Sequence, residues 1–383
     1  MSTDFRFASL QLPPSAIEVR RRIRAFMRDE LDGRRYDPQV SSWNTWDENF
    51  TRRAGEAGFI GMVWPKEYGG RDASDLERFV VIEEMLAHSA PCFAHWVADR
   101  QTGPQILKFG SERVKRTYLP AMAAGQCYAA IGMSEPNSGS DLASVQTRAT
   151  PCAGGWRING TKIWTSSAHR AHVLIALVRT SPVHGARHEG LTQFVIDTSA
   201  PGINCRPIYN LCGDHDFNEV HFEDYFVPDD AVLGKVGQGW KLVNHELSFE
   251  RSGPDRYMSD FRLILDAVDR VGKRPDALQS VEVGRLFAHL SALRRMSAGV
   301  AGLLAQGEDP YLEAAIVKDL GTSFEQSIPE IARRLIEAQP SSEDDDEYGR
   351  CYTETRLFAP GYTIRGGTRE IMRGVIARGL GLR

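Results

Sequence analysis

Glu250 stands in a setting that could turn a carboxylate into a base. It belongs to the segment Leu247-Ser-Phe-Glu-Arg-Ser-Gly253, with an apolar Leu and an apolar Phe before it. A carboxylate that is shielded from water is poorly stabilised, so its pKa rises and it can remove a proton. The alternative is an ion pair between Glu250 and Arg251 or Arg256 on a helix surface. From these residues alone, the surface ion pair is the favoured interpretation.

Two segments in the middle of the chain carry small hydroxyl side chains. They are Met133-Ser-Glu-Pro-Asn-Ser-Gly-Ser-Asp141 and Trp164-Thr-Ser166. A serine hydroxyl both donates and accepts hydrogen bonds, and Gly139 lets a ligand approach the backbone closely. Considered without further information, these residues are typical of a turn and a strand.

Several catalytic and metal-binding patterns are missing from the sequence. Gly234-Lys-Val-Gly-Gln-Gly239 lacks the spacing and the βαβ context of a dinucleotide-binding fingerprint. His245-Glu246 lacks the second His of a zinc protease, and there is neither a Walker P-loop nor a Gly-x-Ser-x-Gly elbow. The six cysteines form no Cys-x-x-Cys pair, so we expect reduced thiols in a cytoplasmic protein and no metal site.

Length and charge exclude other classes. The 383 residues suit two or three domains, and 25% charged with 42% hydrophobic residues is an ordinary globular balance. The net charge of −4 argues against a nucleic-acid-binding protein. The basic cluster within residues 20–24 is expected to be a solvated helix face. No apolar run approaches the roughly 20 residues of a membrane span, and the first residues do not form a signal peptide.

The N-terminal stretch, residues 1–125, is predicted to be an α-helical domain. Three capping boxes precede apolar stripes of helical spacing, at Ser15-Ala-Ile-Glu18, Thr45-Trp-Asp-Glu48 and Ser74-Asp-Leu-Glu77. Such boxes satisfy the free N–H groups at the start of a helix. Trp64-Pro-Lys-Glu-Tyr-Gly-Gly70 is expected to be a loop.

The middle stretch, residues 126–236, is predicted to be a small β-barrel. Asn159-Gly160 indicates a hairpin turn, and residues 173–178 and 191–196 are short apolar runs. Residues 217–222 alternate with a period of two.

Residues 237–383 are predicted to form a four-helix bundle. Helical spacing covers residues 238–271, 277–306 and 309–338, and a last helix follows Gly366-Gly367. The acidic segment 340–347 is expected to be a surface loop. The predicted fold is therefore α+β, mainly α, with helical, β-barrel and bundle domains in that order.

The motifs, taken in this order, resemble the acyl-CoA dehydrogenase family over nearly the whole chain. The segments that carry the resemblance are Met133 to Asp141, Trp164-Thr-Ser166, Asn218-Glu-Val-His-Phe-Glu-Asp224 with Val227-Pro228, Gly239-Trp240, and Gly366-Gly-Thr-Arg-Glu-Ile371 with Arg378-Gly-Leu-Gly-Leu-Arg383. Each motif is weak alone. The resemblance implies FAD, α,β-dehydrogenation of an acyl-CoA thioester and a place in fatty acid or lipid catabolism.

The resemblance also assigns residues. It implies that Met133, Ser134, Trp164 and Ser166 line the flavin ring, with the two serines standing where the family usually has Thr. It implies that Ser140 contacts CoA and that Gly139 and Gly367 let backbone approach the ligand. Thr368 and Glu370 match positions that contact the FAD diphosphate–ribose region, and Arg251 is expected to bind substrate.

The base is expected at an uncommon position. Most members carry a Glu directly before the C-terminal Gly-Thr, where this chain has Gly366. A smaller branch, which includes bacterial FadE-type enzymes, places the Glu on a bundle helix directly before an Arg. Glu250-Arg251 resembles that arrangement, so Glu250 is implied to remove the α-proton while the β-hydride passes to flavin N5.

Two family segments that grip the adenine half of a neighbouring subunit's FAD are not found. The Arg-x-x-Phe-Gly segment would fall within residues 269–276, and the Gln-x-x-Gly-Gly stretch after Lys318-Asp-Leu-Gly-Thr322. Either a paralogous subunit supplies this grip in a heteromer, as in the steroid-degrading branch, or a homo-oligomer holds FAD differently.

Three functions remain open at this point. The first is an acyl-CoA dehydrogenase that reduces an electron-transfer flavoprotein. The second is a flavin oxidase or monooxygenase on the same scaffold, and the third is a weakly active or structural partner subunit. The presence of Glu250 and the serine hydroxyls favours the dehydrogenase.

Overall fold

A computed structural model describes residue 7 and residues 11–38, 41–42, 44–183, 185–336 and 347–382. The chain divides into two compact units. The bundle unit comprises Met1–Trp46, Ser74–Cys92 and Ser248–Arg383, and the sheet unit comprises Asp47–Ala73 and Phe93–Leu247. Each unit is described by itself below. The domain boundaries predicted at 125/126 and 236/237 stay predictions.

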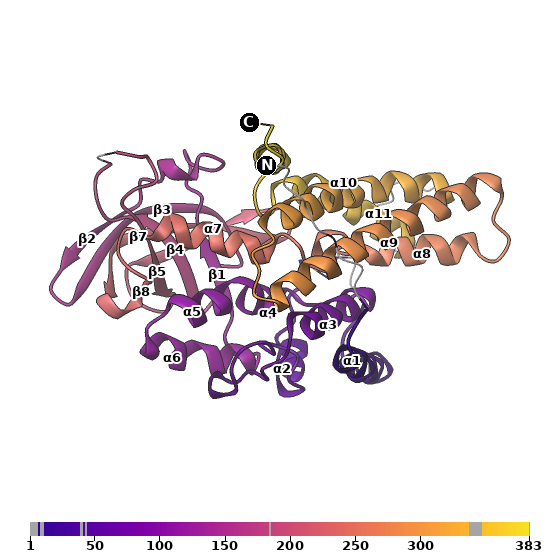
Figure 1. Ribbon diagram of the computed structural model, residues 1–383, viewed down its shortest axis with the longest axis horizontal. Coiled ribbons are helices and arrows are strands. Elements are labelled where there is room, and N and C mark those ends of the chain that lie inside the picture. Colours follow the sequence, from indigo (N-terminus) through magenta and orange to yellow (C-terminus); the bar gives the residue numbers. More distant parts are fainter. Residues whose placement is uncertain are drawn as a thin grey trace. The chain divides into compact units, whose positions relative to one another are not determined.

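Helices, strands and again helices follow one another along the chain (Figure 1). The first helices are α1 (Pro14–Asp32), α2 (Glu48–Glu56), α3 (Asp75–Ala87), α4 (Phe93–Val97), α5 (Gly103–Phe109) and α6 (Glu112–Ala123). The strands are β1 (Ala129–Gly132), β2 (Arg148–Cys152), β3 (Gly155–Ser166), β4 (Val173–Arg179), β5 (Leu191–Asp197), β6 (Ile203–Tyr209), β7 (His215–Pro228) and β8 (Val232–Leu233). The last helices are α7 (Gly239–Glu250), α8 (Phe261–Val271), α9 (Ala277–Ala305), α10 (Tyr311–Ile336), α11 (Glu347–Phe358) and α12 (Arg369–Gly379). The predicted α+β fold, mainly α, is confirmed.

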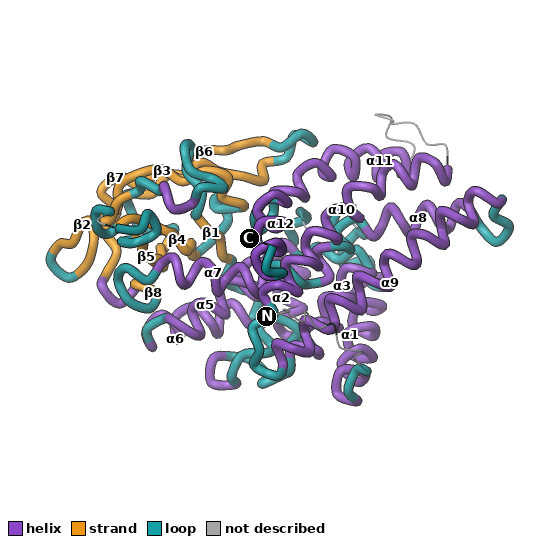
Figure 2. Tube along the Cα trace, turned by 45° about the horizontal axis from the view of Figure 1, so that its top comes forward, coloured by secondary structure: helices purple, strands orange, loops and turns teal. Residues whose placement is uncertain are grey.

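The strands of the sheet unit form one eight-stranded sheet (Figure 2). Its order is β6-β7-β3-β2-β4-β5-β8, and β1 pairs in parallel with β4. Every residue of β4 is buried, as its apolar sequence predicts for a strand covered on both faces. The alternation predicted for β7 is confirmed, because Asn218, Val220 and Phe222 are buried while their neighbours are only partly covered.

The predicted hairpin turn is wrong. The chain reverses between β2 and β3 at Gly154, whose φ of 75° suits glycine. Asn159-Gly160 lies inside β3 instead, where the register with β7 shifts. A side chain at Gly160 would collide with Thr147, so the glycine allows β3 to lie close to the residue that directly precedes β2.

Helices α8 to α11 belong to the bundle unit, in which α9 and α10 are the longest (Figure 1). The helix predicted over residues 238–271 is wrong, because α7 ends at Glu250 and α8 begins only at Phe261. Gly253-Pro254 falls in this break, and proline lacks the N–H that a continuous helix needs. Helix α11 was not predicted, and all of the predicted acidic loop except Glu347, which begins α11, lies outside the described residues.

Helices α1 and α3 also belong to the bundle unit. Ala16 of α1 and Phe79 of α3 share an apolar cluster with Ala301 of α9. Glu83 of α3 accepts hydrogen bonds from Arg20 of α1, at 2.6 Å, and from Arg294 of α9. The basic cluster in residues 20–24 is therefore not simply a solvated face, because Arg20 pairs with a carboxylate on α3.

One of the three predicted capping boxes is confirmed. Ser74 accepts from the Glu77 N–H while Glu77 accepts from the Ser74 N–H at the start of α3. The other two are wrong. Helix α1 is preceded by Pro13 and has no side-chain cap, and α2 is capped by Asp47, which accepts from the Phe50 N–H at 2.9 Å. Among the residues that the structure describes, no helix is long and apolar enough to cross a membrane.

Candidate active site

In the sheet unit, the two hydroxyl-bearing segments lie side by side. The Ile163 N–H donates to the Ser134 carbonyl oxygen at 2.9 Å. The Lys162 ammonium donates to the Met133 carbonyl oxygen at 3.0 Å. The structure therefore brings Met133 and Ser134 next to the segment that carries Trp164 and Ser166.

Trp164 lies in a bulge of β3. The register between β3 and β7 shifts between Lys162 and Thr165, and Trp164 has a φ of 60°, which is unusual for a bulky residue. The residue is 57% exposed, and its indole contacts the Phe217 ring edge-on, with 5.9 Å between centroids. A large aromatic side chain held in this way is available to cover a flat ligand.

The predicted hydroxyl donors are accessible. Ser134 and Ser166 are partly buried, and neither hydroxyl has a hydrogen-bond partner among the described residues. Gly139 and Ser140 are exposed, and a Cβ added at Gly139 would meet no atom within 4 Å. Asp141 pairs with Arg187 at 2.6 Å beside Ser140.

A buried ion pair that the sequence did not reveal lies behind these segments. The Lys162 ammonium is 2.8 Å from a Glu135 carboxylate oxygen, with side chains 0% and 7% exposed. Glu135 also accepts from the N–H groups of Gln146 and Thr147. Burial raises the pKa of Glu135, but the Lys162 charge and these hydrogen bonds outweigh it, so the pKa lies below its usual value. Burial lowers the pKa of Lys162 to about 8, and Glu135 partly opposes this.

In the bundle unit, the predicted C-terminal residues lie at the start of α12. Gly366 and Gly367 have φ values of 66° and 94°, a backbone that favours glycine. The Thr368 hydroxyl caps the helix by accepting from the Ile371 N–H at 3.3 Å. Glu370 is exposed in the first turn, where its own backbone N–H and then the Thr368 side chain lower its carboxyl pKa. A helix N-terminus of this kind attracts anions such as a diphosphate.

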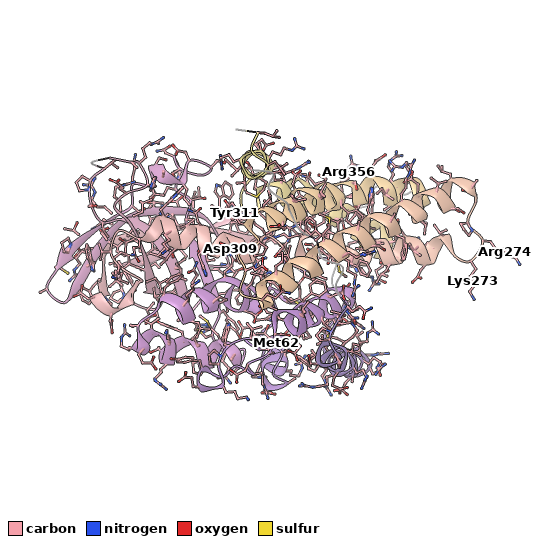
Figure 3. All side chains as sticks on the ribbon, viewed as in Figure 1. Met62, Lys273, Arg274, Asp309, Tyr311 and Arg356 are labelled. Carbon is pink, nitrogen blue, oxygen red and sulfur yellow. The ribbon has the colours of Figure 1, made fainter. Side chains whose placement is uncertain are left out.

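Arg251 is the best-defined charged residue near the predicted base. It is 2% exposed, and its Nε donates to the Gly366 carbonyl oxygen at 3.2 Å. Its guanidinium lies 5.3 Å from the centroid of the Tyr311 ring. Tyr311, labelled in Figure 3, is the first residue of α10. Its Nη1 is buried with no hydrogen-bond partner in the described part of the chain. Glu250 is the last residue of α7, and its side chain lies outside what the structure describes.

These residues fit FAD. The sheet unit offers an exposed indole and two unpartnered hydroxyls for a flat heteroaromatic ring. The bundle unit offers a capped helix N-terminus for a diphosphate. Among the described residues, no group of three or more His, Cys, Asp or Glu side chains could hold a metal ion.

Comparisons with known proteins agree over the length of the chain. Residues 13–126, 130–225 and 237–381 match the family models described as acyl-CoA dehydrogenase N-terminal, middle and C-terminal domain. Acyl-CoA dehydrogenase IpdE1 of Mycobacterium tuberculosis is 31% identical, with 95% of this chain and 97% of IpdE1 covered. Acyl-CoA dehydrogenase FadE34 of the same organism is 32% identical over 85% of this chain, which spans 45% of FadE34.

A solved structure described as "Tcur3481-Tcur3483 steroid ACAD" has a similar fold. It superposes with a TM-score of 0.84 at 27% identity, covering 97% of this chain and 99% of that chain.

Proposed function

The chain belongs to the acyl-CoA dehydrogenase family, and from this premise we propose that Glu250 removes the α-proton of an acyl-CoA thioester. The protein is an oxidoreductase that acts on acyl-CoA, and its cofactor is FAD. In the proposed reaction, the Glu250 carboxylate takes the α-proton and the β-hydrogen leaves as a hydride. The electron pair of the α C–H bond becomes the new double bond of a trans-2-enoyl-CoA. Bound FAD supplies the hydride acceptor.

The contact between Arg251 and Gly366 carries this proposal. Most family members place the base at the position of Gly366, which has no side chain that could take a proton. The Arg251 Nε donates to the Gly366 carbonyl oxygen, so the residue after Glu250 touches that same position. This contact supports the proposal that Glu250, the residue before Arg251, serves as the base in place of a glutamate at position 366.

Within each unit by itself, particular residues are assigned to the cofactor. We assign the ring contacts to Met133, Ser134, Trp164 and Ser166. The diphosphate–ribose contacts are assigned to Gly367, Thr368 and Glu370. For the substrate, Ser140 is assigned to the CoA portion, with Gly139 leaving room beside it. The Nη1 of Arg251, which has no partner among the described residues, is assigned to donate to an oxygen of the substrate.

The test is Glu250→Gln, which keeps the size of the side chain and removes the base. Turnover is expected to fall by at least about 100-fold, while the flavin content stays at the wild-type level. Glu308→Gln, at an exposed glutamate of the same unit, is the matched control. Near-normal turnover of Glu250→Gln would refute the assignment.

The proposed substrates are branched, long or ring-bearing acyl groups rather than short straight chains. Two observations support this class: the helix-borne Glu, and the steroid acyl-CoA dehydrogenase named above as a similar structure. An acyl-CoA panel with an artificial electron acceptor tests it. A preference for short straight chains would contradict it.

We propose an assembly in which a paralogous subunit grips the adenine half of FAD. The sequence lacks both family segments for that grip, and residues 272–276 form only the turn between α8 and α9, where Lys273 and Arg274 lie (Figure 3). The similar structure is described by two protein names, as a two-protein complex would be. Little FAD in the protein expressed alone, restored on co-expression with a paralogue, would support this. Full FAD occupancy of the protein alone would favour a homo-oligomer.

The proposed electron acceptor is an electron-transfer flavoprotein. An oxidase would instead transfer electrons to oxygen. Hydrogen peroxide formed at the rate of turnover, without an added acceptor, would therefore point to the oxidase alternative.

A further inference from the structure

A second cluster of polar side chains is buried in the sheet unit, apart from the segments assigned to the flavin. Gln101 and Thr102 come from the helical segment that joins α4 to α5, and Gln105 from α5 itself. Gln193 comes from β5 and Glu246 from α7. All five residues are at most 7% exposed. The family resemblance assigned no role to any of them.

Glu246 is the centre of this cluster, which we call the amide cluster. Gln101 Nε2 lies 3.4 Å from one carboxylate oxygen of Glu246, and Gln193 Nε2 lies 3.2 Å from the other. Gln105 Nε2 donates to the Leu242 carbonyl oxygen at 2.8 Å, one turn earlier in α7. The helix that ends at Glu250 is thus held by amides from three other elements.

Three atoms of the amide cluster lack partners. Thr102 Oγ1, Gln105 Oε1 and Gln193 Oε1 are buried, and none has a hydrogen-bond partner among the residues that the structure describes. These three residues are 0%, 1% and 0% exposed. A buried polar atom without a partner costs about 1–3 kcal/mol. Two of the three atoms are acceptors, so a group with an O–H is the natural complement.

The backbone beside the cluster is also unusual. Residues Ala98–Thr102 form a π-helical turn, and all five are buried. Such turns are rare and occur often at functional sites. This turn places Gln101 and Thr102 in the cluster. A regular α-helix would have a lower conformational free energy and would suffice for a purely structural segment.

We infer that the amide cluster is the polar end of the acyl-binding site and takes a hydroxyl group carried by the acyl chain. This inference rests on the proposed function of Glu250. Glu246 lies four residues before Glu250, which is about 6 Å along the helix axis. The hydroxyl would therefore sit several carbon atoms beyond the reacting carbons. Its proton would be donated to Gln105 Oε1 or Gln193 Oε1, and its oxygen would accept from the Thr102 hydroxyl.

The experiment compares two acyl-CoAs with the same carbon skeleton, one with and one without a hydroxyl on the distal part of the chain. Their dissociation constants are measured calorimetrically on the FAD-loaded protein, together with kcat/KM. The wild type is expected to favour the hydroxylated compound by at least about tenfold in both quantities. Thr102→Val, which removes only the unpartnered hydroxyl at nearly constant volume, should lower that ratio several-fold. Gln193→Leu should lower it further.

Gln126→Leu, at an exposed glutamine of the same unit, is the control and should leave the ratio unchanged. A wild-type ratio near one, or a ratio that neither cluster variant lowers, would overturn the inference. Because binding is measured apart from turnover, its failure can be distinguished from failure of the proposed function. Suppose that neither compound is turned over, but the wild type binds the hydroxylated compound tenfold more tightly and both variants abolish this preference. That result would support the role of the amide cluster and refute only the catalytic proposal.

Discussion

The Lys162 ammonium lies between the Glu135 carboxylate, at 2.8 Å, and the Met133 carbonyl oxygen, at 3.0 Å. One fully buried cation thereby joins the segment of Met133 and Ser134 to the strand that carries Trp164 and Ser166. Both segments are assigned to the same flavin ring. The ion pair therefore sets the spacing of the proposed ring contacts without being expected to touch the ring itself.

Lys162→Met should damage both stability and flavin binding. The substitution leaves the Glu135 carboxylate buried without its cation, and breaking such a pair costs about 3–5 kcal/mol. Urea unfolding of the apoprotein and the flavin absorption of the purified protein measure the two effects. Lys66→Met is the control, because Lys66 is 76% exposed and its pair with Asp72 should contribute under about 1 kcal/mol. Wild-type values of both quantities in Lys162→Met would contradict this role.

Asp260 should make the protein less stable as the pH rises. Burial, followed by the nearby Glu325, raises the pKa of Asp260 from 3.8 to about 8, and the Tyr362 hydroxyl donates to it at 2.5 Å. Between pH 3.8 and about pH 8, the folded state therefore keeps a proton on Asp260 that the unfolded state releases. The free energy of unfolding therefore falls with rising pH, by at most about 1.4 kcal/mol per pH unit from this group.

Asp260→Asn tests that pH dependence, because asparagine is neutral throughout and still accepts from Tyr362. Urea unfolding between about pH 4 and about pH 8 should show a shallower decline for the variant than for the wild type. Parallel curves for the two proteins would mean that Asp260 titrates normally in the folded state.

Ser74→Ala should destabilise the bundle unit by about 1 kcal/mol, since it removes a capping box at the start of α3. Ser15→Ala is a matched control, because Ser15 is exposed inside α1 and caps nothing. Thermal unfolding should separate the two variants. Equal losses would show that the sequence pattern, rather than the observed cap, governs stability.

Arg251→Lys should lower kcat by about tenfold or more and should raise KM by a smaller factor. The reason is that lysine cannot reproduce the Arg251 Nε contact with Gly366. The positive charge is retained, so the fold and the flavin content should be preserved. Arg333→Lys, at an exposed arginine of α10, should leave both constants unchanged. A pure KM effect for Arg251→Lys would indicate substrate binding without a role in ordering the Gly366 backbone.

The sequence predicted elements best where one pattern ran without interruption. Helix α9 was expected over residues 277–306 and occupies Ala277–Ala305. The break between α7 and α8 was missed because apolar spacing continues on both sides of Gly253-Pro254, although Pro254 was a signal for it. The two other capping patterns misled because several residues near a helix start can serve as caps, and tertiary packing decides among them.

The sequence predicted those site residues that belong to recognisable motifs and missed the others. The hydroxyl-bearing segments were found, and the structure brings those of the sheet unit together. Lys162 was not found, because lysine is usually exposed and its sequence neighbours do not show that a carboxylate is buried opposite. Gln101 and Gln193 were missed for a similar reason. Both contact Glu246 from distant parts of the sequence, and no local pattern predicts such a contact.

The division into two units has a consequence for synthesis on the ribosome. Helices α1 and α3 share the cluster of Ala16 and Phe79 with α9, which emerges only after residues 93–247 have been made. The long uninterrupted part of the sheet unit can begin to fold before α9 has been synthesised, when the apolar faces of α1 and α3 are still uncovered. These early helices are thus exposed to chaperones and proteases until translation is nearly complete. Nascent chains halted before α9 should therefore be cleaved first within the N-terminal helices.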